Sequence, residues 1–130
     1  MNCGGALKAV NETNLKYHLN EQSPILVVTF KGALIKSNLP VLERCRIEVS
    51  ESKAAFVVLH FLDATRLDLP TVSFLIRLQH LIRKKPAELR ICSLSADFES
   101  VLVDRGAIRR EELEKNLSEA VRRFRRQLKC

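Results

Sequence analysis

The side chains best placed for chemistry follow an apolar run in the middle of the chain. Residues 57–61 (VVLHF) are almost wholly apolar, which predicts a buried strand. A polar turn follows, and Pro70 then suits the first turn of a helix, where its missing N–H costs nothing. A helix start presents free backbone N–H groups and a partial positive charge. We therefore expect this junction to meet a protein partner or a phosphate.

Three polar residues near this helix start each have two interpretations. Asp68 could orient a partner's backbone or a magnesium-bound phosphate, but an Asp at this position more often caps the helix. Thr71 keeps a hydroxyl that a kinase could modify, but helical spacing places it on the apolar stripe, where its methyl group would pack. His60 could be a pH-sensitive contact, although a lone histidine at a strand end is more often a hydrogen-bonded structural residue.

The remaining reactive side chains give little support for catalysis. Cys3, Cys45, Cys92 and Cys130 are widely separated, with no CxxC pair, so we expect no metal site. Cys45 and Cys92 lie in apolar patterns and are predicted to be buried free thiols. The sequence contains no nucleophile elbow and no Walker loop, and its three histidines are dispersed. We therefore expect neither an enzyme nor a bound cofactor.

Length and charge limit the class of protein. The 130 residues suit one domain, expected over 13–130, with a flexible tail at 1–12. The formal net charge is +7, and residues 105–130 hold nine basic and four acidic side chains. That asymmetry fits either an anionic partner or the solvated face of a terminal helix. The start of the chain does not resemble a signal peptide and no apolar run could span a membrane, so we expect a cytoplasmic protein.

Hydrophobic periodicity supplies the elements that position this junction. Strands are predicted at 13–20, 25–32, 54–61 and 88–94, with a short edge strand near Ile108. Helices are predicted at four places: after Ser37 or Asn38, over 70–84, from Ser95 to Gly106, and along a stripe from Leu113 to Leu128. The order predicts an α/β fold with a mixed sheet of four to five strands and about four helices, mostly on one face. The first two strands would pair antiparallel, and strands separated by helices would pair parallel.

Over roughly residues 13–126, the chain resembles the STAS domain family, named for sulfate transporters and anti-sigma factor antagonists. The resemblance is carried by the element order and by four stretches: ILVVTFKGAL, VVLHFLDATRLD, LRICSLSADFESVLVDRGA and the pair Glu119-Ala120. Family members typically read VVLDLSxVxxIDSSGLGxLL through the middle stretch. This resemblance implies a STAS-like fold.

The chain departs from the family pattern at the site that matters most. In an ungapped register, Asp68 matches the family's second Asp, whereas His60 stands at its first. Leu69 and Pro70 replace the two serines, and in the anti-sigma factor antagonists a partner kinase phosphorylates the second. Pro70 has no hydroxyl, so the resemblance implies a domain that cannot be phosphorylated at this position. Thr71 is the possible substitute.

The resemblance implies a non-catalytic protein–protein interaction module of bacterial signalling and transcription regulation. Its partner would be a kinase-type anti-sigma factor or another signalling protein. Alternatives are a small cytoplasmic accessory subunit of a lipid-transporting ABC system, a basic adaptor for nucleic acid or membrane, and a small ligand at the helix start. The predicted partner surface is the 60–68 turn with the exposed side of helix 70–84, where Val72 and Ile76 fall off the apolar stripe. It comprises His60, Asp63, Arg66, Asp68, Thr71, Val72, Ile76, Arg77, His80 and Arg83.

Overall fold

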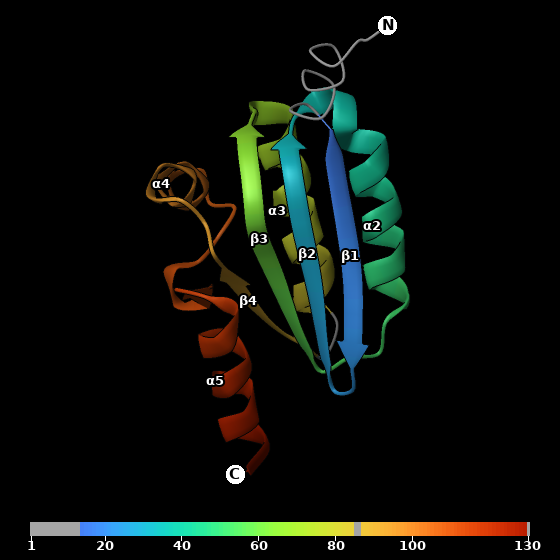
Figure 1. Cartoon of the computed structure of the whole chain (residues 1–130), viewed down its shortest axis with the longest axis vertical. Helices are drawn as coiled ribbons and strands as arrows, with labels where there is room; N and C mark the ends of the chain where they lie inside the picture. The colour runs from blue at the N-terminus through green and yellow to red at the C-terminus, as the bar shows by residue number, and fades with distance from the viewer. Residues whose placement is uncertain (1–13, 85–86, 130) are drawn as a thin grey trace, which may run out of the picture.

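A mixed five-stranded sheet organises the part of the chain that the computed structural model describes, residues 14–84 and 87–129 (Figure 1). The elements in chain order are β1 (Leu15–Gln22), β2 (Ile25–Leu34), the 3-10 helix η1 (Lys36–Asn38), α2 (Leu39–Glu51), β3 (Phe56–Leu67), α3 (Leu69–Lys84), β4 (Glu88–Cys92), α4 (Ala96–Asp104), the 3-10 helix η2 (Arg110–Glu112), β5 (Leu113–Glu114) and α5 (Leu117–Lys129). The strands lie in the order β1-β2-β3-β4-β5. The pair β1–β2 is antiparallel and the other pairs are parallel, which confirms the predicted α/β fold.

The helices pack mostly on one face of the sheet. Strand side chains such as Val28, Leu59 and Ile91 share a core with α2 and α3. The alternate residues of the same strands, including Val58, pack with Phe124 of α5 on the other face. In Figure 1 the helices α2 and α3 lie behind the sheet, whereas α5 lies on the viewer's side. This alternation follows from the two-residue period of a strand, and it gives the domain two unequal layers of helix.

The central strands are longer than the sequence predicts. β2 continues past Gly32 to Leu34, and β3 continues past Phe61 to Leu67. The two strands stay paired along this extension, with Lys31 opposite Asp63 and Leu34 opposite Leu67. The predicted 60–68 turn is therefore wrong. The polar residues after Phe61 belong to a strand whose backbone hydrogen bonds are supplied by β2.

Gly32 allows β1 and β2 to close at this end of the sheet. Its φ is 118°, a conformation that side chains other than glycine's rarely adopt. A Cβ atom here would lie 1.9 Å from the carbonyl oxygen of Asn14. That carbonyl accepts a 3.0 Å hydrogen bond from the backbone N–H of Ala33. The beginning of β1 is thereby fixed beside the end of β2.

The segment after β4 is only partly as predicted. Ser95 caps α4, because its hydroxyl accepts a 3.2 Å hydrogen bond from the N–H of Phe98. The edge strand lies at Leu113–Glu114 rather than at Ile108. Ile108 instead closes the end of α4, where its N–H bonds the carbonyl of Leu102 and its side chain is buried. Leu113 consequently belongs to β5 and not to the stripe of α5, and the side chain of Leu128 lies outside the described ones.

Candidate docking site at the start of α3

Asp68 ties together three elements at the start of α3. Its Oδ1 accepts hydrogen bonds from the N–H of Thr71 at 3.1 Å and from the Thr71 hydroxyl at 2.8 Å. Its Oδ2 accepts a 2.7 Å hydrogen bond from the N–H of Lys36 in η1. Its own N–H donates to the carbonyl of Leu34, the last residue of β2. Asp68 therefore caps the helix, as its position in the sequence favours, and both of its oxygens already have partners.

The electrostatics of Asp68 fit this structural role. Partial desolvation raises the pKa of its carboxyl, but the hydrogen bonds from Lys36 and Thr71 act together in the opposite direction. The net effect holds the pKa of Asp68 below its usual value. The carboxylate is thus charged near neutral pH, where it also complements the positive end of α3.

The Thr71 hydroxyl is poorly placed for phosphorylation. The side chain is fully buried, and its hydroxyl donates a hydrogen bond to the carboxylate of Asp68. A phosphate would break that bond and bring about two negative charges beside a carboxylate. The prediction that Thr71 packs on the apolar side of the helix is confirmed. Leu69 and Pro70, by contrast, are exposed at the same helix start.

The exposed side of α3 does not include all the residues that the sequence predicts there. Val72 is only 3% exposed and Ile76 packs half-buried against the core, so the expected apolar patch is wrong. The buried arc is wider than one stripe because α3 contacts both the sheet and α2. The exposed positions are Leu69 and Pro70 at the helix start and then, at helical spacing, Ser73, Arg77, His80 and Lys84.

A groove runs along this exposed side between α2 and α3. It has a volume of about 660 Å³ and is lined by Glu43, Arg46, Arg77, His80, Leu81 and Lys84. Arg46 is engaged by Glu43 at 3.1 Å, whereas the guanidinium of Arg77 lies over the Phe74 ring. Two of the predicted partner residues, Arg77 and His80, therefore line one basic groove.

Arg83 points to a different neighbour. Its guanidinium makes a two-point ion pair with Glu112 of η2, at 2.7 Å and 3.1 Å. Glu112 also accepts a hydrogen bond from the N–H of Arg109, so the pair fixes η2 against α3. The prediction that Arg83 belongs to an open patch with Val72 and Ile76 is therefore wrong.

His60 lies apart from the α3 surface. It shares the sheet face of Phe56 and Val58, opposite the face that α3 covers. The side chain is 8% exposed, and among the described residues its Nδ1 has no hydrogen-bond partner. Burial lowers the pKa of His60. Its ring is thus a buried neutral group, whereas Asp63 and Arg66 are exposed farther along β3.

Two exposed leucines, Leu62 and Leu69, are not among the predicted partner residues. Leu62 is 51% exposed and Leu69 is 54% exposed. Leu62 lies where β3 has one residue more than β2, between the pairs Thr29–His60 and Lys31–Asp63. Leu69 is the first residue of α3, where no preceding turn covers it. The exposure of Leu69 could have been inferred from its position directly before Pro70, at the start of the helix.

The described residues contain no group of three side chains suited to a metal ion, and none of their helices is long and apolar enough to cross a bilayer. The site consists instead of the hydrogen-bonded cap at Asp68, the exposed residues Leu69 and Pro70 beside it, and the basic groove. Such a surface can contact another macromolecule.

Comparisons with known proteins agree with this architecture. A family model described as the STAS domain matches residues 16–120. A search among curated protein sequences found no significant match. The structure is similar to an anti-sigma factor antagonist from Mycobacterium paratuberculosis, with a TM-score of 0.69 and 14% identity, over 86% of this chain and 95% of that one.

Two further solved structures show the same fold. A variant of Moorella thermoacetica RsbS has a TM-score of 0.74 at 12% identity, over 88% of this chain and 99% of that one. The murine anion transporter Slc26a9 has a TM-score of 0.70 at 14% identity, over 90% of this chain but 23% of the transporter. At such identities the likeness shows the fold alone. With the family match over most of its length, the chain belongs to the STAS domain family.

Proposed function

We propose that this chain is a non-catalytic protein-docking module of the anti-sigma factor antagonist type. Its partner is a kinase-type anti-sigma factor or another signalling protein, and it binds the start and exposed side of α3. The observation that carries the proposal is the Asp68 cap, whose two oxygens are bonded to Thr71 and Lys36 while Leu69 and Pro70 beside it are exposed. A reactive centre needs polar groups free for substrate, whereas a docking site needs exposed apolar surface beside a rigid frame.

We further propose that binding works without the serine switch that the family resemblance implies for its phosphorylated members. Pro70 stands at the serine position and has no hydroxyl. Thr71, the nearest substitute, is buried and bonded to Asp68. The module is therefore constitutive or regulated elsewhere. Incubation with a partner kinase and labelled ATP should leave the protein unlabelled, and labelling that disappears in Thr71→Ala would contradict this part of the proposal.

The docking surface favours a partner with an apolar contact flanked by negative charge. Leu69 supplies the exposed apolar side chain. Arg77, His80 and Lys84 supply the basic side of the neighbouring groove. Complementary charges of this kind raise association rates and fix orientation more than they raise affinity.

The test is binding of purified anti-sigma kinases, measured by calorimetry, to the intact protein and to matched variants. Leu69→Glu should weaken binding at least about tenfold, because it places a charge in the apolar contact. Ile47→Glu is the control. Ile47 of α2 is 48% exposed, a fraction similar to that of Leu69, but it does not belong to the site. Equal effects of the two substitutions, or no binding to any signalling protein, would reject the proposed site.

A further inference from the structure

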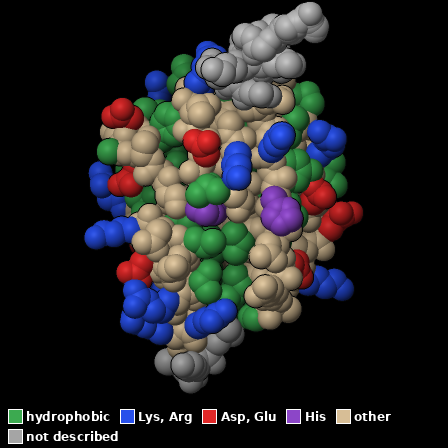
Figure 2. Space-filling model, viewed as in Figure 1, with side chains coloured by type: hydrophobic (Ala, Val, Ile, Leu, Met, Phe, Trp, Pro, Cys, Tyr) green, Lys and Arg blue, Asp and Glu red, His purple; other side chains and the backbone are tan. Residues whose placement is uncertain are grey.

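Helix α5 uses one side to hold the sheet and leaves the other cationic. Ala120 and Phe124 are fully buried, and the Phe124 ring packs against Phe56 with centroids 4.5 Å apart. Arg122, Arg125 and Arg126 are exposed. Figure 1 shows that α5 covers only part of the sheet face, because β1 and β2 run past it uncovered. In Figure 2 hydrophobic side chains are visible over the middle of this uncovered face.

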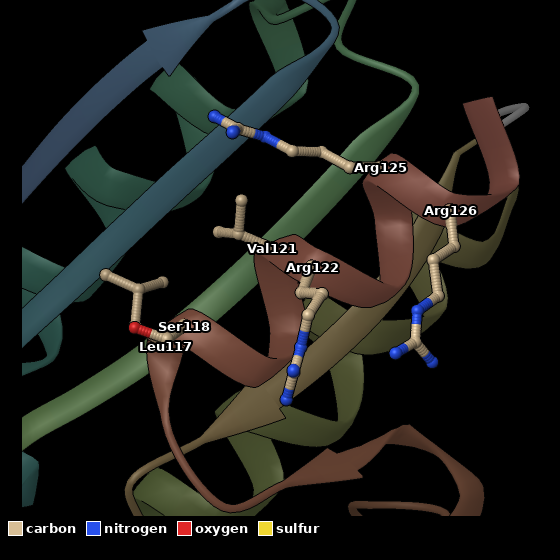
Figure 3. A pocket seen from close by; sticks show the side chains of 6 residues that line it. All are labelled: Leu117, Ser118, Val121, Arg122, Arg125 and Arg126. Carbon is tan, nitrogen blue, oxygen red and sulfur yellow. The ribbon is translucent and has the colours of Figure 1, made fainter. Parts of the chain in front are cut away.

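A small groove lies where α5 meets the uncovered strands. It has a volume of about 70 Å³ and is lined by Asn20, Gln22, Ile25, Val27, Val121 and Arg125. Its floor is aliphatic, from the isoleucine and the two valines, and its rim carries two amides and a guanidinium. In Figure 3, Val121 and Arg125 extend from α5 toward β2.

This groove continues onto the outer side of α5. A hollow of about 650 Å³ there is lined by Leu117, Ser118, Val121, Arg122, Arg125 and Arg126. Val121 and Arg125 line both spaces, so the aliphatic floor and the arginines form one continuous surface, which we name the α5 groove.

The arginines of the α5 groove differ in whether they form an ion pair with a carboxylate. Arg122 is paired with Glu119, and Arg123, outside the groove, reaches Glu114 at 2.8 Å. Among the described residues, no carboxylate pairs with Arg125 or Arg126. The guanidinium of Arg125, beside the aliphatic floor, and that of Arg126, in the hollow on the outer side of α5, therefore remain available to an anionic ligand (Figure 3).

We propose that the α5 groove binds an acidic peptide segment of a partner protein, one that carries an aliphatic side chain between its carboxylates. The aliphatic side chain fits over Val27 and Val121. The carboxylates pair with Arg125 and Arg126, for which the guanidinium fork is suited. The amides of Asn20 and Gln22 can bond the backbone of the segment. This site lies on the sheet face opposite α3 and is independent of the proposed function.

Other anionic ligands fit the surface less well. Nucleic acid bound through single strands requires aromatic stacking, and no residue lining the α5 groove is aromatic. An amphipathic helix binds a bilayer through its apolar side, and the central apolar residues of α5, Ala120 and Phe124, are already buried on the sheet. The aliphatic floor would be unused by a phosphate backbone or a lipid headgroup.

The test is binding of the full chain to a fluorescently labelled peptide in which acidic residues (Asp or Glu) alternate with Leu. Fluorescence anisotropy of the peptide measures the affinity. Arg125→Glu with Arg126→Glu should weaken binding at least about tenfold. Arg44→Glu with Lys53→Glu makes the same charge change at exposed positions outside the groove and should leave affinity within about twofold. A peptide with Ser in place of Leu should bind at least about threefold more weakly.

Several outcomes would overturn the proposal. They are absence of peptide binding at low salt, equal losses in the two charge-reversal variants, and equal binding of the Leu and Ser peptides. Tighter binding of a single-stranded DNA oligonucleotide, or of phosphatidylserine vesicles, would assign the surface to those ligands instead. Circular dichroism checks that each variant is folded, and Arg125→Ala with Arg126→Ala replaces the first variant if it is not.

Discussion

Arg83 of α3 and Glu112 of η2 form a two-point ion pair across 29 residues of sequence, with their closest atoms 2.7 Å apart. The side chain of Glu112 is 9% exposed and that of Arg83 is 20% exposed. The pair holds the segment between α4 and β5 against the helix that carries the candidate docking site. Removing either partner leaves the other charge poorly hydrated.

Arg83→Met should therefore lower the free energy of unfolding by about 2–3 kcal/mol, somewhat less than for a wholly buried pair. Arg46→Met is the matched control. Arg46 pairs with Glu43 on the surface of α2, and its loss should cost below about 1 kcal/mol. Urea denaturation measures both. A cost for Arg83→Met no larger than for Arg46→Met would show that the pair does not fix η2.

Asp68→Ala should lower the free energy of unfolding by about 1–2 kcal/mol, because the N–H of Thr71 and the N–H of Lys36 lose their acceptor. Asp68→Asn keeps only one acceptor oxygen, and its NH2 group would face a donor of Lys36 or Thr71, so it should retain only part of the stability. Because the folded-state pKa of Asp68 is lowered, its charge stabilises the fold above about pH 4 and this contribution is lost as the pH falls further. In Asp68→Asn, that part of the pH dependence should disappear from denaturation curves.

His60 should make the fold less stable in mild acid. Burial lowers its pKa in the folded state, so below about pH 6.5 the unfolded chain takes up a proton that the folded chain resists. Above that pH, His60 therefore does not reduce the free energy of unfolding. The free energy of unfolding decreases as the pH falls toward the folded-state pKa. His60→Leu should flatten the unfolding free energy between about pH 7 and pH 5. An unchanged slope in that variant would contradict the assignment.

The thiols of Cys45 and Cys92 should be unreactive in the native protein. Burial raises the pKa of Cys45 to about 12 and that of Cys92 to about 11, and the thiolate is the reactive form. In a background with Cys3→Ser and Cys130→Ser, a thiol reagent at neutral pH should label the protein slowly, and rapidly once urea unfolds it. Rapid labelling of the folded protein would show that these side chains are accessible.

The order of the elements from β1 to β4 and the positions of the α-helices could be predicted because these segments carry apolar patterns, which the two-residue strand β5 lacks. Strand and helix periods are distinct around Val28 and Leu42, and Ser95 is a clear cap. The extension of β3 could not be predicted in this way. Asp63 and Arg66 are polar as turn residues are, and only the backbone of β2 beside them makes them a strand.

The sequence predicts the Asp68 cap and two residues of the exposed surface, Arg77 and His80, but not the rest of that surface. The cap at Asp68 follows from a local rule and was foreseen, and so was the burial of Thr71. Val72 was misplaced because a helical wheel assumes one buried side, whereas α3 packs against the sheet and α2 at once. Leu62 depends on a strand irregularity that the sequence does not mark.

The ladder that joins β2 and β3 as far as Leu67 has a consequence for association with other proteins. It means that α3 begins at the tip of a paired ribbon rather than at the end of a free connection. The surface that a partner would contact at this tip is therefore already ordered before binding. Little chain entropy is then lost on complex formation, so recognition here should follow a lock-and-key course rather than one in which folding accompanies contact.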